Sequence, residues 1–273
     1  MSKLLKANFY KLFHSKIYWI CLLLMSLLNI YNAVASDSLL MLHEVHGKNE
    51  TYWMGWNFME ISTYLAHLWY ISYIIIAVTI LFVGDDYSSG SIRNKILAGH
   101  SRFKIYLSYF TTSYVGAMII HIISEALGLG YCLVRFGLKF YHITSESVKS
   151  SLALCIHLNI SAVVAIATFV GISLLCMVVT ARRVPAMAIG LVLNILASQY
   201  VENKMYNVIM FHGENQQADK RALMLLSLEP NGLIKSNLVE WNNFHTACIL
   251  CCIMTLIIVV TVGIIVIRKR ELK

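Results

Sequence analysis

Proline and charged residues are both scarce in this chain. Only two prolines occur in 273 residues, and Asp, Glu, Lys and Arg make up 13% of the chain against 58% hydrophobic residues. So little charge cannot cover the surface of a soluble domain of this length, which excludes most soluble classes. The near absence of proline leaves long helices uninterrupted. We therefore predict an all-α integral membrane protein with a single domain over residues 1–273.

The sequence also lacks the motifs of an enzyme. Segment 47–49 reads Gly-Lys-Asn, without the Ser or Thr that follows the lysine of a phosphate-binding loop. The two histidines of segment 43–46 are three residues apart, whereas a helical zinc motif needs four. The seven cysteines fall in or beside apolar segments, where packing explains them better than a disulfide framework or a metal site. We predict no catalytic residue, no metal ligand and no cofactor bound by this chain.

Six apolar segments are long enough to cross a bilayer as helices. They cover about 17–35, 63–83, 105–134, 152–180, 184–201 and 246–267. The long polar segment 202–245 contains the turn sequence Glu-Pro-Asn-Gly at 229–232, which predicts short helices on the outer side. The sequence therefore predicts six transmembrane helices.

Lysine and arginine gather on one side of these helices. Segments 1–16, 84–104, 181–183 and 268–273 hold 4, 4, 2 and 4 of the 22 lysines and arginines. The positive-inside rule then places these segments, and both termini, in the cytoplasm. Because the net charge of +8 comes from the ends of apolar runs, it indicates membrane topology and no nucleic-acid partner. We expect a multi-pass protein of the plasma membrane.

The first sixteen residues predict an amphipathic helix on the membrane surface. Apolar residues share one face (Leu5, Phe9, Leu12 and Phe13), and basic residues share the other (Lys3, Lys11 and His14). A secretory signal is the alternative, since an apolar run at 17–30 precedes the small-residue pattern Ala-Val-Ala at 33–35. The amphipathic start favours an interfacial helix that leads into a span.

The polar segment 84–104 predicts a short surface helix between the second and third spans. Ser88 to Ser91 supply turn and capping residues, and Ile92 to Leu97 allow about two helical turns. Gly99 ends that helix, and Ser101 is placed to cap the next. An element of this shape is suited to contact a partner in the cytoplasm.

This segment resembles one in the permease subunits of type-2 ABC exporters. In that family an acidic residue precedes Gly-Ser/Thr-Ile and a basic residue, and a Gly or Pro and Ser-Arg follow. The matching residues are Asp86, Gly90, Ser91, Ile92, Arg93, Asn94, Lys95, Gly99, Ser101 and Arg102, with aspartate at 86 where the family more often has glutamate. The opening segment 4–12, LLKANFYKL, resembles the elbow helix of the same family.

The resemblance implies an ABC transporter permease for export from a bacterial cell, with an elbow helix at 1–16 and a coupling segment at 84–104. ATP and Mg²⁺ would bind two copies of a separate ATPase subunit. The permease would pair with a second copy or a homologous permease, surrounded by membrane lipid. It also implies that 84–104 contacts the ATPase. Ile92, Ile96 and Leu97 are expected to fill a groove on it, while Arg93 and Lys95 face its rim or lipid phosphates.

Polar residues inside the predicted spans are candidates for a transport path. These are His121, Glu125, His157, Asn159 and Asn194. Because ionisable groups are costly in lipid, they should face the bundle interior and find partners. His121 and Glu125, four residues apart, would suit a proton-coupled secondary transporter, but polar contacts between helices explain them equally well. A non-transporting membrane partner in antibiotic sensing or immunity is a further alternative.

Overall fold

The computed structural model describes residues 1–43, 51–136, 145–210 and 244–269. Within these ranges there are eight helices and no strand, so the all-α prediction is confirmed. The helices are α1 (Ser2–Phe13), α2 (Lys16–His43), α3 (Thr51–Ser88), α4 (Ser91–Leu97), α5 (Arg102–Phe136), α6 (Ser145–Thr180), α7 (Arg183–Met210) and α10 (Phe244–Lys269).

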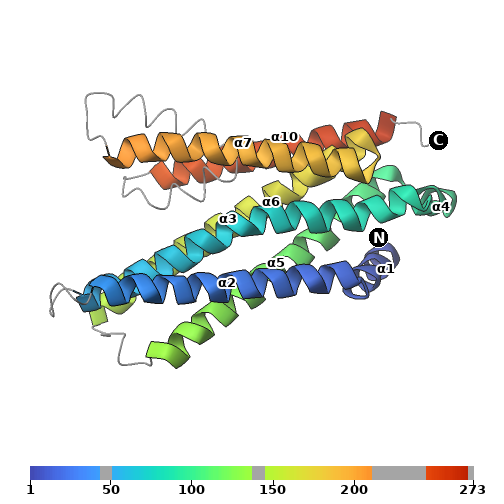
Figure 1. Ribbon diagram of the computed structural model, residues 1–273. Coiled ribbons are helices and arrows are strands. Elements are labelled where there is room, and N and C mark those ends of the chain that lie inside the picture. The colour runs from blue at the N-terminus through green and yellow to red at the C-terminus, as the bar shows by residue number, and fades with distance from the viewer. Residues whose placement is uncertain (44–50, 137–144, 211–243, 270–273) are drawn as a thin grey trace.

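The six long helices run side by side, and the short helices α1 and α4 lie together at one end (Figure 1). Helix α3 is central, since it contacts α2, α5, α6 and α7. Helix α10 packs mainly on α6 and is the most exposed of the long apolar helices. The N-terminus and the end of α10 lie at the same end as α4 (Figure 1). We call this the basic end, formed by residues 1–16, 84–104, 181–183 and 268–269.

Among the described residues, four helices contain a stretch long and apolar enough to cross a membrane. These stretches are Tyr70–Ser88, Arg102–Gly128, Asn159–Thr180 and Thr246–Lys269. Helices α1 and α2, which meet at a 62° bend, add a fifth if they are taken as one broken span. The chain therefore fits a multi-pass membrane protein.

All six segments predicted as spans are helical, but α7 is not among the candidate spans of the described residues. The polar residues Arg183, Asn194 and Gln199 lower the mean hydropathy of α7. The segment 36–62, which lies between the first two predicted spans, is also partly helical, because α2 continues to His43 and α3 begins at Thr51. A helix that leaves the bilayer keeps its internal hydrogen bonds, so a change of composition alone does not end it.

The predicted outer segment 202–245 is described only in part. Helix α7 continues to Met210, beyond its predicted end at 201. The turn at 229–232 and the short helices expected around it lie outside the described residues. The cytoplasmic or outer position of any segment stays a prediction.

Two glycines set the limits of α4: Gly99 ends it, as predicted, and within the predicted capping segment 88–91 the N-cap is Gly90, with no hydrogen bond from a serine side chain. Gly90 precedes the helix with φ 70°, and Gly99 follows it with φ 84°. The N–H of Gly99 donates to Ile96 O at 2.9 Å, and the N–H of His100 donates to Lys95 O at 3.2 Å. This pair of bonds is the Schellman pattern, in which a left-handed glycine ends a helix. The short helix between two long ones is therefore confirmed.

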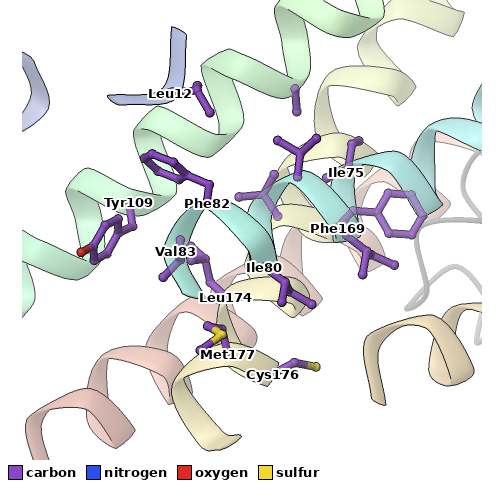
Figure 2. Packing of buried hydrophobic residues seen from close by; sticks show 14 of the residues in the cluster. Leu12, Ile75, Ile80, Phe82, Val83, Tyr109, Phe169, Leu174, Cys176 and Met177 are labelled. Atoms are coloured by element: carbon purple, nitrogen blue, oxygen red, sulfur yellow. The ribbon is translucent and has the colours of Figure 1, made fainter. Parts of the chain in front are cut away.

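The core of the bundle lies where α3, α5 and α6 meet (Figure 2). Phe82 meets Tyr109 edge-on, with ring centroids 6.1 Å apart. Val83, Leu174 and Met177 are buried in the same cluster. Since lipid is as apolar as these side chains, close packing holds such a core together more than exclusion of water does.

A close approach at Gly116 lets α1 pack against α5. A methyl group added at Gly116 would lie 2.6 Å from the nearest Leu12 carbon. The hydroxyl of Tyr18, at the start of α2, donates to Gly116 O at 3.1 Å. Both α1 and α2 therefore meet α5 at this one glycine.

We predict that Gly116→Ala destabilises the protein, although alanine is the better helix former. Overpacking typically costs about 1–3 kcal/mol, whereas the propensity gain is about 1 kcal/mol. The matched control is Gly130→Ala on the same helix, because nothing lies within 4 Å of a Cβ added there. Melting temperatures of both variants in detergent test this, and equal values would contradict the packing described at Gly116.

Candidate functional site

A network of buried and partly buried polar side chains joins four helices at the basic end. It consists of Asn8 and Lys11 of α1, Asp86 of α3, Lys95 of α4, and Ser108 and Tyr109 of α5, and we call it the Asp86 network. Asp86, Asn8, Ser108 and Tyr109 are all buried. The network thus connects the two short helices to the long ones.

The Asp86 carboxylate accepts hydrogen bonds from three side chains. Lys11 Nζ lies 2.7 Å from Oδ1, and Lys95 Nζ lies 2.6 Å from Oδ2. The Tyr109 hydroxyl also donates to Oδ2, at 2.5 Å. A carboxylate buried this deeply needs such partners, because an unpaired charge in the interior is very costly.

Lys95 uses all three of its donors inside the protein. Besides Asp86, its ammonium group donates to Asn8 Oδ1 at 2.9 Å and to the Tyr109 hydroxyl at 3.0 Å. Asn8 in turn donates from Nδ2 to Ser108 Oγ at 2.8 Å. The single lysine of α4 that points inward therefore contacts α1, α3 and α5 at once.

The charges of the network do not cancel, since two ammonium groups share one carboxylate. Other contacts partly stabilise the excess positive charge. Lys11 donates to Phe82 O at 3.0 Å, and its Nζ lies 5.1 Å from the centre of the Phe82 ring. Burial lowers the pKa of Lys95, and the Asp86 carboxylate opposes that shift. Removing the carboxylate would leave both ammonium groups without their counter-charge.

The inward face of α4 differs from the one expected. Ile92 was expected to fill a partner's groove, but it is buried in the protein's own core, and Ile96 packs against the same core. Lys95 was expected to face outward and instead binds Asp86. With two long helices anchoring its ends, a two-turn helix has to bury its apolar face on them.

The outward face of α4 is short. Its exposed residues are Arg93, Asn94 and Leu97, and 76% of the Leu97 surface is accessible. Gly90 is exposed and Ser91 is half-buried at the start of the helix. Of the apolar residues expected to contact a partner, only Leu97 therefore projects fully from the surface.

Two arginines tie the remaining helices to the same end. Arg102, expected to serve in coupling, donates from Nη1 to the carbonyls of Ile267 and Arg268 at 3.2 and 3.1 Å, which satisfies the last turn of α10. Arg183 of α7 lies 2.7 Å from Asp85 Oδ1 and also contacts Ser88. Asp85 thus binds α7, while its neighbour Asp86 binds α1 and α4.

Sequence reasoning missed Asn8, Lys11 and Tyr109. The buried stripe of α1 is Leu4, Asn8 and Leu12, which is rotated from the stripe predicted through Leu5 and Phe9 and carries a polar residue at its centre. Lys11, predicted to lie on the outer face, turns inward to Asp86. A short polar side chain between two apolar ones at i, i+4 and i+8 was the available signal for a polar contact beneath the helix.

The polar residues of the predicted spans do not form one site in the described structure. His121 Nε2 lies 3.4 Å from Glu125 Oε2 within α5. Asn194 of α7 donates to Ser72 Oγ of α3 at 3.0 Å, which is a contact between helices. Asn159 is exposed on α6, and the His157 side chain lies outside the described residues.

Comparison of the chain with protein-family models gives no match, and comparison with curated proteins gives none either. What the site does therefore has to follow from its geometry. A short helix held rigidly by buried charges between two long helices can pass a push on its outer face to the bundle.

We predict that Asp86→Asn destabilises the protein by about 3 kcal/mol, because it leaves two partly buried ammonium groups without their counter-charge. Asp85→Asn is the matched control. The Asp85–Arg183 pair is exposed by 38% on each side, so its loss should cost about 1 kcal/mol or less. Thermal unfolding in detergent measures both variants. Similar losses for the two would show that the Asp86 network does not hold this end together.

Proposed function

We propose that this chain is the permease subunit of an ATP-driven exporter, with α1 as elbow helix and α4 as coupling helix. Six spans, cytoplasmic termini and a bacterial plasma membrane belong to the proposal. ATP and Mg²⁺ bind to two copies of a partner ATPase, and a second permease completes the path. The chain itself is a transport subunit and no enzyme.

The observation that carries the proposal is the attachment of α4 through Lys95. A coupling element has to be exposed on one side and rigidly joined to the spans on the other. The inner side of α4 meets this requirement through Lys95 and Ile92, and the outer side exposes Arg93, Asn94 and Leu97. The motif resemblance at 86–102 supplies the partner class.

The outer face of α4 suggests what the partner surface contains. We expect the partner to have an apolar pocket that binds Leu97 and, beside it, a carboxylate that pairs with Arg93. A buried aliphatic anchor next to a charged pair is a common arrangement at the centre of an interface. An ATPase that docks here would push on Leu97 and Arg93, and Lys95 would pass the movement to α1, α3 and α5.

We predict that Leu97→Asp prevents the partner ATPase from binding to this chain. The full chain is purified in mild detergent from the membranes of its own host. We expect a second polypeptide with a phosphate-binding loop to co-purify with it and to hydrolyse ATP in the presence of Mg²⁺. The substitution should lower this activity about tenfold or more, as for other central interface residues.

The matched control is Val184→Asp, since Val184 is 80% exposed at the same end but lies on α7. Unlike Ile92, both residues are exposed, so neither change opens the core. Full ATPase activity with Leu97→Asp would contradict docking at α4. No ATPase with the unaltered chain would contradict the proposed function itself.

A proton-coupled transporter is the second candidate, favoured by the contact between His121 and Glu125. Glu125→Gln keeps the size of the side chain and removes its ability to give up a proton. If Glu125 carries protons, uptake or export driven by a pH gradient in vesicles should be lost while assembly is kept. If the ATPase drives transport, the variant should respond to ATP like the unaltered chain.

A further inference from the structure

The outer side of α1 carries a basic stripe that the proposed function does not use. Lys3, Lys6 and Tyr10 lie on successive turns and are exposed, whereas Leu4, Asn8 and Leu12 are buried against the bundle. Lys16, the first residue of α2 just past the bend, is also exposed. We call Lys3, Lys6 and Lys16 the α1 stripe.

Among the residues that the structure describes, no carboxylate forms an ion pair with Lys3, Lys6 or Lys16. The first Asp or Glu of the sequence is Asp37, so residues 1–36 carry only positive side-chain charge. The one lysine of α1 that has a carboxylate partner is Lys11, which points inward to Asp86. The outer stripe is therefore a surface of one sign that favours an anionic ligand.

Two exposed aromatic side chains accompany the lysines of the stripe. Trp19 is 53% exposed, and its indole N–H donates to Phe13 O at 2.7 Å, which fixes it at the end of α1. Tyr10 is 66% exposed and stacks on His14 with centroids 3.9 Å apart. Exposed Trp and Tyr next to apolar helices are typical of the boundary between headgroups and acyl chains.

After Trp19, α2 has an exposed aliphatic face, which we call the aliphatic wall. Ile20, Leu23, Leu24 and Leu27 are exposed by 55%, 60%, 46% and 56%. They follow Lys16 at helical spacing and so continue the same side of the helix. Along α2 the order is therefore Lys16, then Trp19, then the aliphatic residues, while Tyr10 lies among the lysines of α1.

We propose that the α1 stripe and the exposed face of α2 bind an anionic phospholipid. The lysines take the phosphate of the headgroup, Trp19 lies at the ester level, and an acyl chain follows Ile20 to Leu27. The order of the three zones matches the order of a lipid molecule across one leaflet. An acidic protein would explain the lysines but would leave the aliphatic wall uncovered. This site is independent of the transport proposal.

Binding of phosphatidylglycerol and of phosphatidylcholine to the purified full chain tests the proposal, with retained lipid counted by native mass spectrometry. The triple change Lys3→Gln, Lys6→Gln and Lys16→Gln should weaken phosphatidylglycerol binding by about tenfold or more. Binding of phosphatidylcholine should stay unchanged. The melting temperature in phosphatidylcholine checks that the variant is folded.

The control removes the same charge elsewhere at the basic end, through Lys104→Gln, Arg182→Gln and Lys269→Gln, all of which are exposed. It should change phosphatidylglycerol binding by less than about twofold. An equal loss in both triple variants would show diffuse attraction and overturn the site, as would no loss in either. Unchanged lipid binding with loss of a co-purifying acidic protein would also overturn it. Should the variant with three changes in the stripe not fold, the double variant Lys6→Gln and Lys16→Gln is compared with the double variant Lys104→Gln and Arg182→Gln, which removes the same charge.

Discussion

One carboxylate shared by two ammonium groups holds the basic end of this protein together. Asp86 binds Lys11 through one oxygen and Lys95 through the other, and Tyr109 completes its hydrogen bonding. A charge so deeply buried persists only where its partners are fixed, so the positions of α1, α4 and α5 depend on it. The short helix α4, which has only two turns of its own, gains its rigidity from this contact.

The two neighbouring aspartates bind helices in different parts of the bundle. Asp86 faces inward to α1 and α4, whereas Asp85 faces α7 and binds Arg183 at the surface. Arg102 adds α10 by donating to its last carbonyls. Every described helix except α2 and α6 thus has a polar contact near α4, which is where a partner would push under the proposed function.

Local features were predictable from the sequence, and side-chain orientation was not. Gly90 and Gly99 fix the ends of α4 by their left-handed conformation, which depends on chain chemistry alone. Six apolar segments were correctly predicted as helices, although only four or five qualify as spans in the described residues. Lys95 and Lys11 turn inward because Asp86 lies between them. Asp86 is 9 and 75 residues away from them in the sequence, and helical periodicity does not predict contacts over such separations.

Hydrogen exchange of the full chain in detergent tests the central role of Asp86 most directly. In the Asp86→Asn variant, peptides covering 2–13 and 91–97 should lose protection together, because Lys11 and Lys95 lose the carboxylate that holds both helices. Peptides from 159–180, in the buried part of α6, should keep theirs. Unchanged protection of α4 in this variant would contradict the account.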